Sequence, residues 1–304
     1  MIDHSILVTV VIPTYRRSVD FLSRAVESVR NQTYANVEII VIDDSTSDYA
    51  GQIEVAAYIE SLNDSRIRYY QNQKNLGGSL ARNRGIEVAS GQYITFLDDD
   101  DEYMPQKVEK QLDFMIAEGY DLTFSNMIMY SSDGKVVDYR EYKDIPGFDN
   151  ETLLRYHLMR HLTGTPTFMF KAEKLKEIGG FEDANMGQEF YLMLKCIQSG
   201  LKIGYFPECD IKVYKHDGEA ISKGKNKIIG EKKLYTFKKS FFHDLKPFER
   251  RYIRFRHYAV MVVAYMRNHM YIKMFFAGIQ AFISAPLVFL NEVTGFFVRI
   301  FRHS

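Results

Sequence analysis

The sequence predicts a mixed α/β fold in which helices flank a mostly parallel sheet, followed by a helical extension at the C-terminal end. Apolar, β-branched runs of strand length alternate with segments whose apolar residues recur at helical spacing. This alternation is typical of parallel strands joined by crossover helices. With 304 residues, the chain is long enough for one large α/β domain and an appendage.

The first elements form a βαβ unit. The run from Ile6 to Ile12 is almost continuously β-branched, as expected of a strand buried on both faces of a parallel sheet, and we expect it to end at Pro13. Apolar residues at helical spacing follow between positions 21 and 29, and a second buried strand is predicted at 37–42. These three elements predict two adjacent parallel strands.

The alternation continues as far as residue 97. We predict a helix at 53–62, a strand at 67–70, a helix at 79–90 and a strand at 93–97. Sheets of this kind bind ligands beyond the carboxyl ends of their strands. The residues that follow each strand are therefore the candidates for a functional site.

Charge divides the chain near residue 222. Residues 223–304 carry 16 Lys and Arg against four acidic residues, whereas residues 1–222 carry a net charge of −12. We therefore predict one domain over 1–222 and a basic, aromatic helical tail over 223–304.

The cysteines and the N-terminus favour a reducing compartment. We interpret Cys196 and Cys209 as core thiols, and no Cys/His spacing indicates a zinc site. The first residues, Met1 to His4, lack the basic region and cleavage site of a signal peptide. We expect a cytoplasmic protein.

Four adjacent carboxylates, Asp98 to Asp101, follow the strand at 93–97. Such close like charges repel one another, so a simple polar turn would rarely use them. Mg²⁺ or Mn²⁺ relieves the repulsion, because these cations bind one or two carboxylates together with the phosphate oxygens of a substrate. A solvated helix start is the alternative. The run predicts a divalent cation site.

Polar and aromatic residues also follow the first two strands. Asp44 can accept a hydrogen bond from the N3–H of uracil, and Tyr15 can offer an aromatic face to a base. A capping aspartate and a packed tyrosine are the alternatives. Gly77-Gly78 then leads into a helix with Arg82, whose amides and guanidinium group suit a diphosphate, although such turns also occur without one. The spacing matches neither Walker A nor G-x-G-x-x-G, which disfavours a P-loop ATPase and a dinucleotide dehydrogenase.

Together these motifs resemble the inverting glycosyltransferases of family 2, of the bacterial, non-processive type with the GT-A fold. The resemblance covers residues 6 to 217 and depends on the order and spacing of its motifs. These are VVIPTY at 10–15, QTY at 32–34, the segments 38–45, 75–85 and 96–105, IGGF at 178–181 and GQE at 187–189.

The resemblance implies a nucleotide-binding half over 1–104 and an acceptor-binding half over 105–222. In the first half it implies that Asp100 ligates Mn²⁺ or Mg²⁺. The residues that it places around the nucleotide sugar are Pro13, Thr14, Tyr15, Asp44, Arg82, Asp98 and Asp99. In related enzymes a histidine at the place of His216 can reach the metal or the diphosphate, and imidazole is a competent Mn²⁺ ligand. A hydrogen-bonded surface histidine is the alternative.

An inverting transfer also needs a base that takes the proton from the acceptor hydroxyl. In the family this is a carboxylate in a Glu-Asp motif that opens a helix. Here Gln188 replaces the usual acid and Glu189 stands where aspartate is usual, so Glu189 is the predicted base. Glu182 and Asp183 are alternatives, as is a glutamate that only starts a surface helix.

The tail predicts a peripheral contact with a membrane. Residues 246–304 hold nine Lys and Arg against two acids among many phenylalanines, and polar residues interrupt the uncharged run 274–291. That run falls short of a transmembrane helix. We expect interfacial helices on anionic lipid at the inner face of the cell membrane. A packing or homodimerisation arm is the alternative, and nucleic acid is disfavoured because the rest of the chain is acidic.

The predicted function is an inverting, metal-assisted sugar transfer from a nucleoside-diphosphate sugar to a hydroxyl of a saccharide or lipid-linked saccharide, in the synthesis of cell-surface polysaccharide. Asp44 favours UDP. The chain has no tryptophan, so it lacks the Q-x-x-R-W motif of processive synthases. A pyrophosphorylase would need a glycine-rich loop after the first strand, which residues 13–17 do not provide. A non-catalytic module that binds nucleotide sugars or a partner protein remains the alternative, because Gln188 departs from the motif.

Overall fold

The computed structural model describes residues 5–162, 164–184, 186–215 and 224–291. The chain forms two compact units, one of Met1–Leu154 and Leu162–Asp217, the other of Arg155–His161 and Gly218–Ser304. The predicted boundary at 222 lies outside the described residues, and it stays a prediction together with the division at 104.

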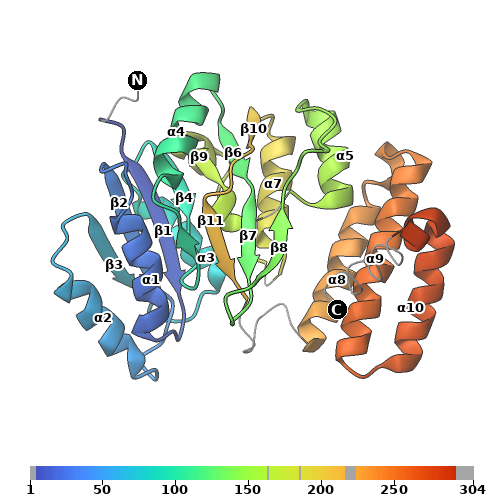
Figure 1. Ribbon diagram of the computed structural model, residues 1–304, viewed down its shortest axis with the longest axis horizontal. Helices are drawn as coiled ribbons and strands as arrows, with labels where there is room; N and C mark the ends of the chain where they lie inside the picture. Colours follow the sequence, from blue (N-terminus) through green and yellow to red (C-terminus); the bar gives the residue numbers. More distant parts are fainter. Residues whose placement is uncertain (1–4, 163, 185, 216–223, 292–304) are drawn as a thin grey trace. The chain divides into compact units, whose positions relative to one another are not determined.

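A seven-stranded sheet forms the centre of the first unit, in the order β10-β6-β9-β4-β1-β2-β3 (Figure 1). Six strands run in one direction, and β9 is antiparallel to both of its neighbours. The mixed, mostly parallel sheet is thereby confirmed. Its strands are β1 (Val8–Thr14), β2 (Val37–Asp43), β3 (Ile67–Gln71), β4 (Tyr93–Phe96), β6 (Leu122–Ser125), β9 (Met169–Lys171) and β10 (Ile203–Phe206).

The first strand extends beyond its predicted end. β1 pairs in parallel with β2 from Val8 opposite Val37 to Thr14 opposite Asp43, so the ladder passes through Pro13. A proline lacks only its own N–H group, and its fixed φ is compatible with extended backbone. The strand therefore ends at Thr14, which places this hydroxyl at the edge of the sheet.

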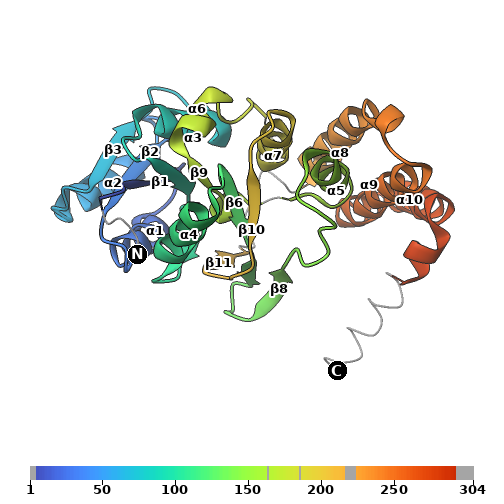
Figure 2. The ribbon, with the colours of Figure 1, turned by 90° about the horizontal axis from the view of Figure 1, so that it is seen from above.

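Helices cover both faces of the sheet, with α1 and α4 on one side and α3 and α6 on the other (Figure 2). α3 lies especially close to β1, because a Cβ atom at Gly85 would stand 2.3 Å from a methyl carbon of Val11. Because Gly85 has no side chain, α3 can pack this close to β1. The helices of this unit are α1 (Val19–Arg30), α2 (Gly51–Ser61), α3 (Gly78–Val88), α4 (Lys107–Glu118), α5 (Asn150–Arg160), which continues into the second unit, α6 (Ala172–Glu177) and α7 (Gln188–Gln198), with the 3₁₀ turn η1 (Thr165–Thr167).

A second sheet of four short strands, in the order β5-β11-β7-β8, completes the first unit. Its strands are β5 (Glu102–Tyr103), β7 (Met127–Tyr130), β8 (Val136–Arg140) and β11 (Ile211–Tyr214). Of the two cysteines, Cys196 is buried on α7 as predicted. Cys209 is only partly buried, because it lies in the connection between β10 and β11 rather than in the core.

The second unit is helical. It contains α8 (Gly224–Lys239), the 3₁₀ turn η2 (Phe242–Asp244), α9 (Pro247–Arg267) and α10 (Tyr271–Ser284). Among its described residues two acids are buried and both are paired, since Glu231 lies 3.0 Å from the His257 ring and Glu249 lies 3.4 Å from the Arg155 guanidinium. Among the described residues, no helix has both the length and the apolar character needed to cross a membrane.

Candidate active site

Polar residues meet at the carboxyl edge of the seven-stranded sheet. The N–H of Asp44, just after β2, donates to the carbonyl of Thr14 at 2.8 Å. The N–H of Leu97, just after β4, donates to the carbonyl of Val11 at 3.0 Å. These bonds hold the segments that follow β2 and β4 against β1, and the sequence had predicted β1 and β2 as adjacent parallel strands.

The four aspartates form a tight turn at this edge, in which the N–H of Asp101 donates to the carbonyl of Asp98 at 3.0 Å. Their side chains alternate in environment. Asp99 and Asp101 are buried, whereas the side chains of Asp98 and Asp100 are 35% and 20% exposed. The turn therefore directs two carboxylates inward and leaves two accessible to a ligand.

Burial is the largest cause of raised pKa values in the inward pair. It raises the pKa of Asp99 to about 7, with the neighbouring charge of Asp100 as the second cause. Burial, followed by the charges of Asp98 and Asp100, raises the pKa of Asp101 as well. The Thr14 hydroxyl donates to Asp99 at 2.7 Å, and the Tyr214 N–H donates to Asp101 at 3.1 Å. The raised pKa values favour the protonated form of these two buried carboxyl groups, which would lessen the repulsion within the run.

Two arginines neutralise the run. Arg17 donates to Asp100 at 2.6 Å and to Asp99 at 3.3 Å, and Arg82 forms an ion pair with Asp98. The sequence interpretation missed Arg17, and it also missed Arg24, whose guanidinium donates to the carbonyl of Asp100 and lies 4.1 Å from the centre of the Tyr214 ring. The sequence did contain a signal for Arg17, because a basic residue just after the first strand lies at the edge where the acidic run was expected.

Arg82 joins the acidic turn to the start of α7. It lies buried on α3, and its guanidinium donates to the Gln188 side-chain oxygen at 2.8 Å. Its Nε is buried and has no hydrogen-bond partner in the part of the chain that the structure describes. The role of Gln188 was also missed from the sequence, since the residue was noted only as a departure from a motif. Gln188 is uncharged, so it accepts this hydrogen bond without offsetting the positive charge of Arg82, which pairs with Asp98.

The predicted nucleoside residues separate into a buried and an exposed group. The Asp44 carboxylate is buried and accepts bonds from the Asn72 side chain at 2.7 Å and from the backbone N–H groups of Leu76 at 2.9 Å and Gly77 at 2.7 Å. It therefore fixes the loop that leads into α3. Tyr15 is 43% exposed beside the half-buried Pro13. Their proposed contacts with a base stay predictions.

Glu189 is the second residue of α7 and is half-buried. The segment before α7 is tied to α3, because the side chain of Asn83 accepts from the N–H of Phe181 and donates to its carbonyl, both at 2.8 Å. The alternative Glu182 lies at the surface in an ion pair with Lys195 at 2.8 Å. Glu189 thus lies at a fixed helix start next to Gln188, which contacts Arg82.

The acidic turn fits a cation that the protein holds with few ligands. Among the described residues, no three His, Cys, Asp or Glu side chains are arranged around one metal position. Mg²⁺ and Mn²⁺ sites that use substrate phosphates need only one or two carboxylates. The partly exposed carboxylates of Asp100 and Asp98 meet that requirement, and their ion pairs with Arg17 and Arg82 show that both bind positive charge. His216 lies outside the described residues.

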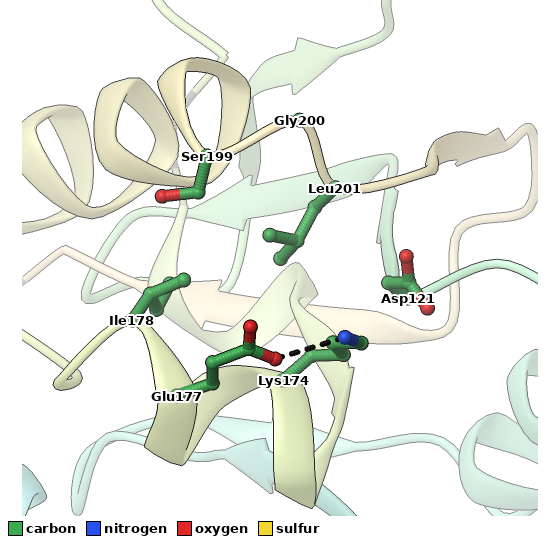
Figure 3. A pocket seen from close by; sticks show the side chains of 7 residues that line it. All are labelled: Asp121, Lys174, Glu177, Ile178, Ser199, Gly200 and Leu201. Carbon is green, nitrogen blue, oxygen red and sulfur yellow. Dashed lines mark hydrogen bonds and ion pairs between the residues drawn. The ribbon is translucent and has the colours of Figure 1, made fainter.

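A small pocket lies at the opposite edge of the sheet (Figure 3). Its lining includes Asp121, which precedes β6, and Leu201, which precedes β10, so it is at the amino ends of these strands. Lys174 and Glu177 in its wall pair with each other at 2.8 Å. Because ligands of such sheets bind at the carboxyl ends, we interpret this pocket as a surface feature.

The comparisons with known proteins agree on one family. The family model described as Glycosyl transferase family 2 matches residues 9–179, which is more than half of the chain. An uncharacterized glycosyltransferase of Methanocaldococcus jannaschii is 29% identical over 207 residues, which cover 68% of this chain and 70% of that protein.

Two further relatives have more specific names. A putative teichuronic acid biosynthesis glycosyltransferase, TuaG of Bacillus subtilis, is 34% identical over 43% of this chain and 51% of its own length. The GalNAc(5)-diNAcBac-PP-undecaprenol beta-1,3-glucosyltransferase of Campylobacter jejuni is 31% identical over 60% of this chain and 55% of its own length. The chain therefore matches about half the length of each.

Among solved structures, S. aureus TarS in complex with UDP-GlcNAc superposes with a TM-score of 0.60 and 15% sequence identity. The superposition covers 95% of this chain and 92% of that one. At this identity the likeness shows the fold alone, which is the predicted GT-A type with its sheet and flanking helices.

Proposed function

The chain belongs to glycosyl transferase family 2, and from this premise we propose that it moves one sugar per encounter from a nucleoside-diphosphate sugar, preferably a UDP-sugar, to a hydroxyl of a saccharide or lipid-linked saccharide. The proposed transfer inverts the anomeric carbon and is assisted by Mn²⁺ or Mg²⁺. The observation that carries the proposal is the turn at 98–101, which presents two partly exposed carboxylates beside two arginines at the carboxyl edge of the sheet, where such sheets bind ligands.

The relatives support the choice of substrates. The structure of TarS contains UDP-GlcNAc, and the Campylobacter jejuni relative is named for an undecaprenol-linked acceptor. The Bacillus subtilis relative is named for the synthesis of a cell-surface polymer. A UDP-sugar donor and a lipid-linked acceptor in polysaccharide synthesis are consistent with all three.

The residues at this edge would share the binding of the donor. The Tyr15 ring would stack on the base, and Arg82 would offset charge on the diphosphate. Asp100 and Asp98 would hold the divalent cation, which when bound offsets the negative charge that develops on the leaving nucleoside diphosphate.

Glu189 supplies the base. Its carboxylate would take the proton from the acceptor hydroxyl while that oxygen attacks the anomeric carbon on the side opposite the leaving group. The bond to the nucleoside diphosphate breaks as the new glycosidic bond forms, which inverts the carbon. The protonated Glu189 then returns its proton to water.

Turnover tests the proposal. UDP release would be measured from a panel of UDP-sugars and acceptors for the parent chain, for Glu189→Gln and for Glu182→Gln. We expect Glu189→Gln to lower kcat by about 10²- to 10⁴-fold, the usual worth of a general base, and Glu182→Gln to stay near the parent value. Loss in Glu182→Gln instead would transfer the role to that residue.

The rival function, a non-catalytic module that binds nucleotide sugars, is favoured by the neutral Gln188 beside Arg82. It predicts no turnover with any donor, and an unchanged Glu189→Gln variant. Thermal stabilisation by UDP, GDP, CMP and dTDP, each with and without Mn²⁺, would still report the preferred nucleotide, because ligands that bind the native state raise its apparent stability.

A further inference from the structure

The last helix of the second unit packs with its small residues inward. The residues of α10 that are buried are Ala277 and Ala281, and Ala277 joins Met261, Ala264 and Tyr265 of α9 in one apolar cluster. α9 and α10 lie side by side and are joined by a short turn (Figure 1). The alanines allow the two helix axes to approach closely, and the side of α10 away from α9 is left accessible.

That accessible side carries the large residues. We call it the outer face of α10, and it consists of Ile272, Phe275, Phe276, Ile279, Phe282 and Ile283, all of which are exposed. At about 100° per residue these positions fall opposite Ala277 and Ala281. A helix that only had to pack within a soluble bundle would show the reverse arrangement, with large apolar residues inside. A contiguous apolar face of this kind indicates an interaction surface.

The charges of the second unit favour one kind of partner for this face. Of the three acids among the described residues of the second unit, Glu231 and Glu249 are buried and paired, which leaves Asp244 as the exposed one. The exposed basic side chains of α8, α9 and α10 are Lys225, Lys232, Lys233, Lys239, Arg251, Arg254, Arg256, Arg267 and Lys273. A second copy of this unit would bring like charge against like charge, whereas an anionic lipid surface is complementary.

We propose that the outer face of α10 inserts into the surface of a membrane containing anionic lipid, with the helix axis along the membrane plane. α10 is about 21 Å long at 1.5 Å per residue, and its apolar arc would be buried at the boundary between head groups and acyl chains. The basic side chains of the same unit would then lie near the lipid phosphates. This narrows the contact expected over residues 246–304 to one helix face, and it does not depend on the proposed sugar transfer.

Vesicle flotation with the full chain tests the proposal. We expect binding to vesicles of phosphatidylglycerol and phosphatidylcholine, with weaker binding to pure phosphatidylcholine and at high salt, which screens the basic side chains. Ile272→Ser should lower the partition coefficient about tenfold, because the isoleucine loses most of its burial in the lipid. Ile272→Ser/Ile283→Ser should lower it further, by about a hundredfold if the two sites act independently.

The matched control is Ile53→Ser. Ile53 lies on α2 in the first unit and is 75% exposed, against 76% for Ile272, so the two variants remove the same side chain at the same exposure. Ile53→Ser should bind vesicles like the parent chain, and neither variant should change the melting temperature. UDP release with a soluble acceptor should also be unchanged in Ile272→Ser, so that a failure here is distinguishable from a failure of the proposed function.

Three outcomes would overturn the proposal. The first is equal vesicle binding by Ile272→Ser and Ile53→Ser, and the second is no binding by the parent chain. The third is a dimer in sedimentation that Ile272→Ser dissociates without any change in vesicle binding, which would assign the outer face to a second copy of the chain.

Discussion

Buried carboxylates lie at both edges of the large sheet, and their pKa values are shifted in opposite directions. At the amino edge, burial alone would raise the pKa of Glu38, but donors from Thr9, Ser90 and Arg68 outweigh it and lower the pKa. The Thr9 hydroxyl donates at 2.6 Å, the Ser90 N–H at 2.9 Å and the Arg68 guanidinium at 2.6 Å. Glu38 is thus a fully satisfied anion that joins three strands and a turn.

At the carboxyl edge the same burial has the opposite result. Asp99 receives donors from Thr14 and Arg17, yet its pKa is raised to about 7, because burial and the adjacent Asp100 dominate. Three further carboxylates lie next to it in the chain. A carboxylate that only stabilises the fold is surrounded by donors, whereas these carboxylates are crowded together. Repulsion between them lowers the stability of the fold and favours the binding of positive charge, as expected of a site for a cation and a diphosphate.

The largest difference between the edges should appear in turnover. Asp100→Asn should lower kcat about a thousandfold, because the variant removes the charge that holds the cation. It should leave the melting temperature unchanged or raise it, since it relieves repulsion within 98–101. Activity with a UDP-sugar and thermal unfolding would be measured on one preparation. Asp133→Asn, at an exposed pair with Lys135, is the control and should change neither.

The amino edge should show the opposite pattern. Glu38→Gln should lower the free energy of unfolding by about 2 kcal/mol, because a charged acceptor of one buried and two partly buried hydrogen bonds is replaced by a neutral amide. Turnover per folded molecule should stay the same, since the residue is at the other end of β2. Urea unfolding with a UDP-release assay would check both. A Glu38→Gln variant that folds normally but has lost activity would break the comparison.

The sequence predicted most of the sheet because the relevant signals are local. β-branched runs and helical periodicity give β1 to β4 and α1 to α3 within a few residues. The strand β9 was not predicted, since three residues carry no periodicity, and it enters the sheet between β4 and β6 only through pairing with distant strands.

The candidate site was predicted in its acidic turn but not in its partners. Arg17 lies 82 residues from Asp99, Gln188 lies 106 from Arg82, and Tyr214 lies 113 from Asp101. Contacts between residues so far apart in the chain depend on the fold and produce no recognisable motif spacing in the sequence. In the same way, the uncharged run in the tail indicated an apolar helix, but only the packing of Ala277 and Ala281 shows which face is outside.

The charges at the carboxyl edge should exchange partners more readily than those at the amino edge. Arg17 occupies Asp99 and Asp100, so a divalent cation must compete with its guanidinium. We expect Arg17→Ala to raise the affinity for Mn²⁺ about tenfold, equivalent to about 1.4 kcal/mol, in calorimetric titration without nucleotide. Arg16→Ala is the matched control, because the neighbouring Arg16 pairs with Asp48 instead. Weaker Mn²⁺ binding in Arg17→Ala would show that the arginine supports the site rather than competing for it.

The smallest expected effect concerns acid stability at the amino edge. Because the folded pKa of Glu38 lies below its ordinary value of 4.5, the unfolded chain takes up the proton first as the pH falls. The stabilisation by Glu38 is therefore complete above pH 4.5 and is lost as the pH falls through the folded pKa. The free energy of unfolding of the parent chain should decline between pH 5 and pH 3 by roughly 1 kcal/mol more than that of Glu38→Gln. Urea unfolding at a series of pH values would measure this, and parallel declines in the two proteins would mean that Glu38 is not the satisfied anion that its three donors indicate.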